Sequence, residues 1–221
     1  MKTIFVSSKC KFPIFFNSID FLSLPSKIGL ISTVQFSHLL PNLKKELEKK
    51  GKKVVIHNNP NILGCNALAA EKIQEKVDAF LFLSSGEFHV LHTATKINKP
   101  IFQFNPITRE FSKFDMSKTK AIKERQEQLK KKFVLAKNIG ILITTKPGQQ
   151  KIKEAIKLKE ILEKKREKNV FMFVANNLDL NQFENFPEIS IYLNTACPGL
   201  MLDSDKIINL EQVEEILNQK K

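Results

Sequence analysis

Short apolar runs, separated by charged segments with helical periodicity, are the feature that most limits how this chain can fold. The runs are rich in Ile, Val, Leu and Phe, and the segments between them carry leucine, lysine and glutamate at helical spacing. This alternation predicts strand–helix–strand units, and runs that are apolar throughout predict parallel strands buried on both faces. The expected fold class is α/β, with two similar small βαβ domains built on parallel sheets. The expected strands are residues 27–33, 52–58, 79–84, 100–104, 139–145, 169–175 and 189–195.

The connecting segments are expected to form helices. The segment that ends at Lys50 tolerates Pro41 only if its helix begins late, so that the proline falls in the first turn. Pro100 and Pro187 stand just before strands, where a missing amide hydrogen costs least. The other expected helices are residues 66–76, a short helix from Phe88, a helix over about 149–168, a short helical turn before 189 and a final helix from about Leu210.

The two sets of runs resemble each other. IGLISTVQ at 28–35 is echoed by IGILITTKPGQ at 139–149, and a Leu/Lys/Glu helix follows each of them. This similarity indicates a duplication. We expect a first βαβ domain with Cys65 at 27–113, a linking helix at 114–138 and a second βαβ domain with Cys197 at 139–221. Residues 1–26 are expected to be a linker or residual strand of a further, missing first domain.

The charge balance of the chain is strongly basic. There are 36 Lys and Arg against 23 Asp and Glu, a formal net charge of +13. The lysines mostly alternate with glutamates at helical spacing, which is typical of solvated helix faces. No aromatic side chains are interleaved with them as base stacking would require, so nucleic acid is the less favoured acidic partner.

The cysteine count and the opening residues bear on the compartment. Three cysteines in 221 residues are a small and odd number, which argues against a disulfide framework and indicates a reducing compartment. The opening residues lack the pattern of a signal peptide, and no apolar run has the length that a membrane-spanning helix needs. We expect a cytoplasmic protein with no membrane partner.

Cys65 and Cys197 each follow an expected strand. Neither has another cysteine or a histidine within two to five residues, so the local spacing of a zinc site or a redox motif is absent. Ligands bind at the carboxyl ends of parallel strands, so both thiols are expected at the ligand-binding edges of their domains, after non-equivalent strands. Two interpretations stay open: buried cysteines acting as small hydrophobes, or one thiolate from each domain bound to a shared metal or cluster.

Several sequence blocks carry a resemblance to a known family. IGLISTVQFSHLL, NILGCNALAA, VDAFLFLSSGEFHVL, KPIFQFNPITREFSK, GILITTKPGQQ and YLNTACPGLMLD resemble, in order and approximate spacing, blocks of the archaeal diphthamide synthase family, and together they cover nearly the whole chain. The resemblance implies an iron–sulfur enzyme of the first step of diphthamide biosynthesis. Such an enzyme cleaves S-adenosylmethionine and adds a 3-amino-3-carboxypropyl radical to a histidine of elongation factor 2. Family members have three similar domains, each of which supplies one cysteine to a central 4Fe–4S cluster.

The resemblance also implies site residues. The cysteine of NILGCN matches the family's second cluster ligand and that of NTACP its third, so Cys65 and Cys197 are the expected metal ligands. Cys10 lies in SSKCKF, which does not match the first ligand block, and it is not expected to be a ligand. No catalytic side chain is assigned. The residues carried over for binding a nucleoside or carboxylate are Gln35, Gly86, His89, Lys146, Gly148 and Gln149.

Two departures from the family shape the expected function. Gly199 stands where family members carry an arginine, and the family's first domain is not expected in this sequence. We therefore expect one part of a split or heteromeric enzyme that acts on elongation factor 2. Its third thiolate would come from a chain with the missing domain or from a paralogous subunit. The alternative is a non-catalytic subunit or binding module of the same family that docks elongation factor 2 or RNA.

Overall fold

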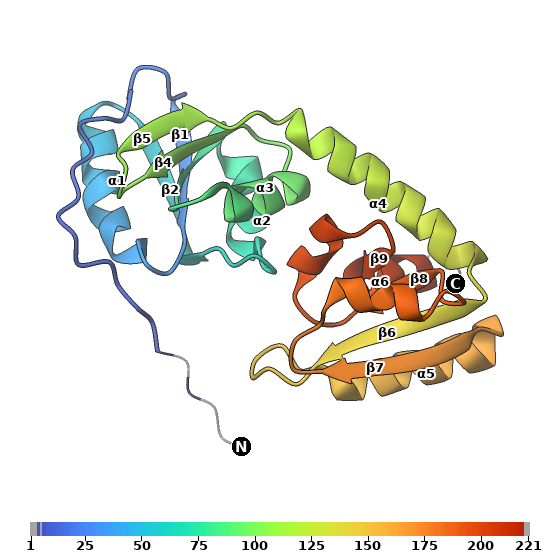
Figure 1. Cartoon of the computed structure of the whole chain (residues 1–221). Coiled ribbons are helices and arrows are strands. Elements are labelled where there is room, and N and C mark those ends of the chain that lie inside the picture. Colours follow the sequence, from blue (N-terminus) through green and yellow to red (C-terminus); the bar gives the residue numbers. More distant parts are fainter. Residues whose placement is uncertain (1–3, 5, 219–221) are drawn as a thin grey trace. The chain divides into compact units, whose positions relative to one another are not determined.

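The computed structural model describes residues 4 and 6–218, and it confirms the α/β class. The chain divides into two compact units, and the division falls between Lys120 and Ala121. Each unit is built on its own sheet (Figure 1). Residues 1–3, 5 and 219–221, which belong to the first and last expected segments, lie outside the described residues.

The first unit contains a five-stranded sheet in the order β2-β1-β3-β4-β5. The pairs among the first four strands are parallel, as predicted. Strand β5 pairs antiparallel with β4 and was not predicted, because its sequence EFSK is short and largely exposed. The strands are β1 (Lys27–Ser32), β2 (Lys53–Asn61), β3 (Ala79–Leu83), β4 (Ile101–Asn105) and β5 (Glu110–Lys113).

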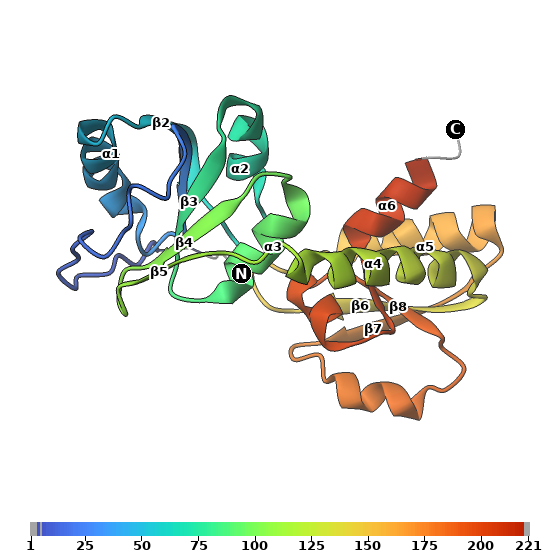
Figure 2. The same ribbon diagram turned by 90° about the horizontal axis from the view of Figure 1, so that it is seen from above.

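Helices cover both faces of this sheet. In Figures 1 and 2, α1 lies on one side and α2 and α3 lie on the other. Buried side chains accordingly form two cores, because alternate strand residues point to opposite faces. Pro41 falls in the first turn of α1, as predicted. The helices are α1 (Leu40–Lys49), α2 (Leu68–Ile73) and α3 (Glu87–Lys96), with 3₁₀ turns at Ser37–Leu39 and Gln74–Lys76.

The segment that precedes β1, which is expected to be a linker or a residual strand, has an irregular backbone. Its described residues form no strand. The segment packs instead through apolar side chains against the core on the α1 face, so burial rather than strand pairing holds it there. The packing side chains are Ile14, Phe16, Ile19, Phe21 and Leu24.

The second unit contains a four-stranded parallel sheet in the order β7-β6-β8-β9. Strand β9 was not predicted, because three residues are too few to show a period. Figure 2 shows α5 on one side of this sheet and the 3₁₀ turn Leu180–Asn185 on the other. The strands are β6 (Asn138–Thr144), β7 (Asn169–Ala175), β8 (Ile191–Asn194) and β9 (Ile207–Asn209); the helices are α4 (Lys118–Leu135), α5 (Ile152–Arg166) and α6 (Leu210–Asn218), with a further 3₁₀ turn, η4, at Pro198–Asp203.

The two sheets share one topology. β6, β7, β8 and β9 occupy the places of β1, β2, β3 and β4, and this correspondence is the outcome that a duplication produces. In each sheet the chain first adds a strand on one side of the opening strand and then crosses to the other side. The switch points therefore lie between β1 and β3 and between β6 and β8, where open α/β sheets bind their ligands.

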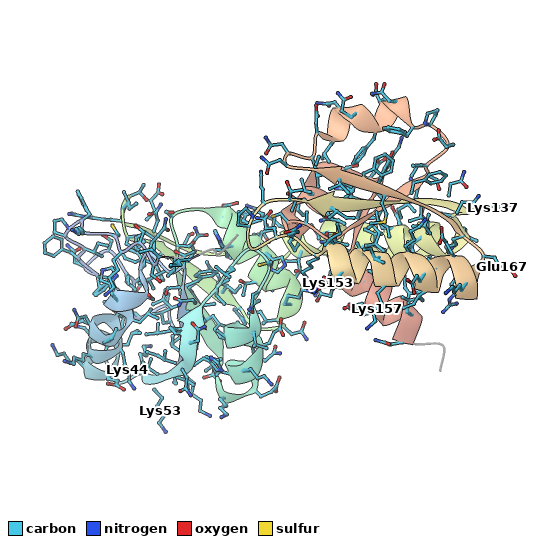
Figure 3. The ribbon with its side chains drawn as sticks, turned by 90° about the horizontal axis from the view of Figure 1, so that it is seen from below. Lys44, Lys53, Lys137, Lys153, Lys157 and Glu167 are labelled. Carbon is cyan, nitrogen blue, oxygen red and sulfur yellow. The ribbon has the colours of Figure 1, made fainter. Side chains whose placement is uncertain are left out.

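The lysine-rich helix faces are solvated, as predicted. Lys44 pairs with Glu48 at 3.7 Å in α1, and Lys159 pairs with Glu163 at 2.6 Å in α5. Lys153 and Lys157, labelled in Figure 3, are exposed on α5. Exposed pairs of this kind contribute only about 0.2–0.5 kcal/mol each, so most of this charge serves solubility and association rather than folding. Among the described residues, no helix combines the length and the apolar character that crossing a bilayer requires.

Candidate functional site: two sheet edges that each carry a thiol

Cys65 lies at the tip of a tight turn that follows β2. The amide of Leu63 donates to the carbonyl of Asn66 at 3.0 Å, and the amide of Asn66 donates back to Leu63 at 3.1 Å. These two bonds place Gly64 and Cys65 at the corner of the turn. The amide of Ile62 donates to the carbonyl of Ser32 at 2.8 Å and ties the loop to the end of β1. The Cys65 thiol is exposed, which excludes the interpretation of a buried small hydrophobe for this residue.

The turn that carries Cys65 rests against the start of α3. The space beside Gly64 is occupied by the ring of Phe88, and a Cβ at Gly64 would overlap that ring. Phe88 in turn packs edge-on against His89, with 5.4 Å between the ring centroids. Leu63, Leu68 and Phe88 are all large apolar side chains that are more than two-fifths exposed. Cys65 therefore stands among apolar groups that nothing in its own unit covers.

Gly64→Ala is expected to displace the Cys65 turn while the unit stays folded. The added methyl can be accommodated only if the half-exposed Phe88 ring moves, at a cost of about 1–3 kcal/mol. The expected readouts are an altered alkylation rate for Cys65, measured by mass spectrometry, and a small loss of stability. The matched control is Gly86→Ala, because a Cβ at Gly86 has nothing within 4 Å. An unchanged Cys65 rate in Gly64→Ala would contradict the packing role of glycine.

The loops after β1 and β3 carry three of the implied binding residues. Gln35 is exposed, and its side-chain oxygen accepts a 3.4 Å hydrogen bond from the hydroxyl of Thr33. Gly86 is the N-cap residue of α3, and the Ser84 hydroxyl donates to its carbonyl at 2.9 Å. The amide of Thr33 donates to the carbonyl of Leu83 at 3.1 Å, which joins the two loops at the switch point. Cys65, Gln35, Gly86 and His89 thus share one sheet edge.

Cys10 also reaches this edge. Its amide donates to the carbonyl of Gln35 at 3.0 Å, and its half-buried side chain packs beside the core on the α1 face. Sequence reasoning placed Cys10 in a linker and missed this position. No pattern could have shown it, because the contact depends on how the irregular segment before β1 folds back.

The environment of His89 favours a neutral imidazole. The side chain is half-buried at the start of α3, and burial lowers its pKa below the ordinary value of 6.5. The unfolded chain therefore binds protons at a higher pH than the folded chain does. The contribution of His89 to stability is fully present above pH 6.5 and is lost as the pH falls through the folded pKa.

An NMR titration of the histidine ring protons is expected to give His89 a midpoint below 6.5. His89→Gln identifies the resonance and should also weaken the loss of stability of the first unit below pH 6.5. A midpoint at or above 6.5 would show that a charged partner outweighs the burial of the ring.

The second unit presents the corresponding loop after β6. The amide of Gln149 donates to the carbonyl of Lys146 at 3.1 Å, which closes a turn with Pro147 and Gly148 at its centre. Gly148 has φ +79°, a left-handed conformation that glycine adopts without strain. The turn stands three residues before α5, and Lys146, Gly148 and Gln149 are all exposed. Open amides and a lysine at a strand end can bind an anionic group.

Cys197 lies in the loop after β8, directly before η4. Its thiol is half-buried, and its carbonyl accepts bonds from the side-chain amide of Asn194 at 2.8 Å and from the amide of Leu200 at 3.1 Å. The amide and hydroxyl of Thr195 both donate to the carbonyl of Leu142 at 3.1 and 2.8 Å, which joins this loop to β6 at the switch point. Sequence reasoning missed the buried asparagines around Cys197. The sequence feature that could have revealed them is the position of Asn194 and Asn209, each at the end of a short apolar strand.

Within each unit the structure brings the implied residues to one sheet edge, and each unit contributes one of the implied ligand thiols. Among the described residues, no three His, Cys, Asp or Glu side chains gather into a metal-binding group. Thiolates are the preferred protein ligands of iron–sulfur clusters, so the two cysteines are of the right chemical type to bind one. The described residues of either unit alone do not supply all the ligands that a cluster needs.

The protein is of the α/β class with repeated doubly wound units. Each unit carries a free cysteine at the sheet edge where such folds bind ligands. A profile of the family described as "Putative diphthamide synthesis protein" matches residues 1–209, and the chain belongs to this family. The 2-(3-amino-3-carboxypropyl)histidine synthase of Pyrococcus horikoshii is 32% identical over 187 residues, which cover 81% of this chain and 52% of the relative. The enzyme of the same name from Methanocaldococcus jannaschii is 27% identical over 180 residues, covering 80% of this chain and 46% of the relative.

Solved structures give the same result. The crystal structure of Dph2 from Pyrococcus horikoshii matches with a TM-score of 0.74 and 28% identity, over 91% of this chain and 60% of that one. A second structure of that protein with a 4Fe–4S cluster matches equally well. More distant relatives include a "2-(3-amino-3-carboxypropyl)histidine synthase subunit 1" from Encephalitozoon cuniculi, 23% identical over 82% of this chain and 52% of the relative. The chain spans about half the length of the curated relatives it matches.

Proposed function

We propose that this chain acts in the first step of diphthamide biosynthesis. It forms part of an enzyme that transfers the 3-amino-3-carboxypropyl group from S-adenosylmethionine to a histidine of elongation factor 2, in the cytoplasm. The observation that carries the proposal is one free cysteine, Cys65 or Cys197, at the ligand-binding edge of each sheet in a fold that matches Dph2 with its 4Fe–4S cluster. The names of the relatives support the reaction class.

Cys65 and Cys197 would hold two irons of the cluster. A thiolate that is exposed, or half-buried in a loop, can bind a metal without a change in the core. The uncovered apolar side chains around Cys65 would exclude water from a cluster bound there, which protects it and raises the strength of electrostatic interactions. When bound, the cluster would supply the electron that cleaves the carbon–sulfur bond on the amino-acid side of S-adenosylmethionine.

The other implied residues would hold the cosubstrate. The open space beside Gly86 admits a ligand close to the backbone at the start of α3. The lowered pKa of His89 leaves a neutral ring that can donate or accept a hydrogen bond. In the second unit, Lys146 and the backbone of the Lys146–Gln149 turn would bind a carboxylate.

The third thiolate would come from outside these 221 residues, either from a further segment of the polypeptide or from another chain. The resemblance supports this part of the proposal, because the blocks around Cys65 and Cys197 match the family's second and third ligand blocks and the block around Cys10 does not match the first. The chain also spans about half the length of its curated relatives. Cys10 is the internal competitor for this role, since its backbone touches the Gln35 loop.

The test is an anaerobic transfer assay. The chain is mixed with S-adenosylmethionine, a reductant, elongation factor 2 from the same organism and each candidate polypeptide that carries the first ligand block. Mass spectrometry of the target histidine measures the transfer. Modification that requires this chain, and that is lost in both Cys65→Ser and Cys197→Ser, is the expected result. Full modification with both variants would reject the catalytic role.

Gly199 favours a second function, a non-catalytic subunit that docks elongation factor 2 or RNA. This position in η4 offers no side chain where the resemblance implies an arginine, so a charge-assisted contact to a carboxylate would be missing. In the same assay this function predicts modification that depends on the presence of the chain and is indifferent to both cysteine substitutions.

A further inference from the structure

Three buried amide side chains surround the backbone of the Cys197 loop. Asn194 ends β8, Asn209 ends β9, and Gln212 lies in the first turn of α6. Their exposed fractions are 2%, 7% and 5%, so all three are more than nine-tenths buried. Burial of an amide is unfavourable unless its hydrogen bonds are made. Asn194 and Asn209 bond to the loop and to each other, and Oε1 of Gln212 accepts the backbone amide of Asn209.

Asn194 binds the loop at two points. Its Nδ2 donates to the carbonyl of Cys197 at 2.8 Å and to Oδ1 of Asn209 at 2.7 Å, while its Oδ1 accepts the amide of Ala196 at 2.9 Å. Both donors and the acceptor of this one side chain are therefore used. The backbone on both sides of the Cys197 side chain is held by a strand residue that cannot move independently of the sheet.

Asn209 extends the same network to the residue after the cysteine. Its Nδ2 donates to the carbonyl of Pro198 at 3.1 Å and lies 3.7 Å from Sδ of Met201. Its own backbone amide donates to Oε1 of Gln212 at 2.9 Å. Pro198 has no amide hydrogen, so its nitrogen cannot donate a hydrogen bond that would fix the chain after Cys197. The carbonyls of Cys197 and Pro198 accept the hydrogen bonds that hold this part of the loop.

A hydrogen-bonded network in a buried site is rigid when every member is satisfied. The side chains of Asn194 and Asn209 form hydrogen bonds with the backbone of three consecutive residues, Ala196, Cys197 and Pro198. Apolar residues in place of Asn194 and Asn209 would leave the backbone amide of Ala196 and the carbonyl of Pro198 without these hydrogen bonds, so the conformation of the loop depends on these two side chains.

We propose that Asn194 and Asn209, supported by Gln212, are positioning residues that fix the direction of the Cys197 thiol at the sheet edge. The network holds the carbonyls on either side of Pro198 and so restricts the rotation that would swing Sγ away from the edge. The role in cluster binding rests on the function proposed above. The positioning of the thiol does not, and it can be measured in the chain without a cluster.

Asn209→Asp tests the network with an almost isosteric change. It keeps the oxygen that accepts from Asn194 and replaces the donor that faces the Pro198 carbonyl by a second oxygen. One buried bond corresponds to roughly a tenfold change in an equilibrium. The new carboxylate also disfavours a nearby thiolate, so the rate is taken from the plateau of the pH profile, where the thiol is fully ionised. There, alkylation by iodoacetamide, measured by peptide mass spectrometry, is expected to be roughly tenfold faster at Cys197 and unchanged at Cys65 of the same molecule.

Gln212 supplies a matched pair of variants that also covers the case in which Asn209→Asp does not fold. Gln212→Glu keeps the acceptor for the Asn209 amide and should retain the native plateau rate at Cys197, whereas Gln212→Met removes the acceptor and should increase that rate. A loss of thermal stability with unchanged rates and pH profile at Cys197 would overturn the proposal. Equal changes at Cys65 and Cys197 would also overturn it, since they report general loosening.

The cluster provides the second readout. In the reconstituted complex, Asn209→Asp is expected to change the EPR spectrum of the cluster relative to wild type. An unchanged spectrum at full iron content would overturn the positioning role toward the cluster. If no cluster forms even with wild-type chain, the function proposed above fails, and the thiol rates still decide whether the network positions Cys197.

Discussion

Gly140→Ala is expected to destabilise the second unit by about 1–3 kcal/mol. A Cβ at Gly140 would lie 2.7 Å from Cε1 of Tyr192 and 3.0 Å from Cε2 of Phe173. The Tyr192 ring cannot retreat, because it is fully buried and stacks on Phe183 with 3.9 Å between the centroids. The lower backbone entropy of unfolded alanine offsets only about 0.5–1 kcal/mol of this cost.

The measurement is convenient because Tyr192 is the only tyrosine and the chain has no tryptophan. Tyrosine fluorescence therefore reports the unfolding of the second unit alone. For a unit of this size each kcal/mol lowers the melting temperature by roughly 4–8 °C. Gly86→Ala, in the open loop of the first unit, is the control and should leave the tyrosine transition unchanged. A Gly140→Ala variant as stable as wild type would show that Tyr192 can repack.

Cys65→Ser and Cys197→Ser are each expected to lower the affinity of the complex for the cluster by at least roughly 100-fold. Loss of a group that merely orients a ligand already costs about 10–100-fold, and the loss of the ligand itself costs more. The second unit contains no cysteine other than Cys197, so the loss of this ligand cannot be repaired within that unit. Cys10 lies at the edge that carries Cys65, and its contribution is tested separately. Iron and sulfide content after anaerobic reconstitution measures the effect.

The control for this experiment is Cys10→Ala. The variant should retain the cluster if the third thiolate comes from outside the 221 residues, and it should lose the cluster if Cys10 supplies that thiolate. Both serine substitutions should leave the tyrosine transition almost unchanged, because Cys65 is exposed and Cys197 is only half-buried. Full iron content in either serine variant would remove that cysteine from the ligand set.

Much of the fold could be predicted because apolar periodicity reports burial directly. The runs at 27–33 and 139–145 read as strands because every residue from Ile28 to Ser32 and from Ile139 to Thr144 is buried, and continuous apolar runs are typical of strands in a sheet covered on both faces. Strands β5 and β9 escaped prediction for the opposite reason. One is short and exposed, the other has three residues, and both exist because a neighbouring strand offers its backbone for pairing.

The candidate site divides in the same way. The positions of Cys65 and Cys197 after strands could be predicted from the apolar runs, whereas their role as ligands is implied by the resemblance of the surrounding blocks. The supports of each thiol could not be assigned. The Phe88 ring beside Gly64 and the asparagines beside Cys197 become neighbours only when loops from different strands meet at one edge.

The sequence by itself determined the fold class, the repeated pattern of strands and helices and the positions of the two thiols after strands, because local periodicity and short blocks encode these features. Only the tertiary structure decided that Cys10 lies against the Gln35 loop, that an aromatic ring supports Cys65 and that a buried amide network supports Cys197. These are contacts between residues distant in sequence, and their energies depend on burial and geometry that no local pattern records.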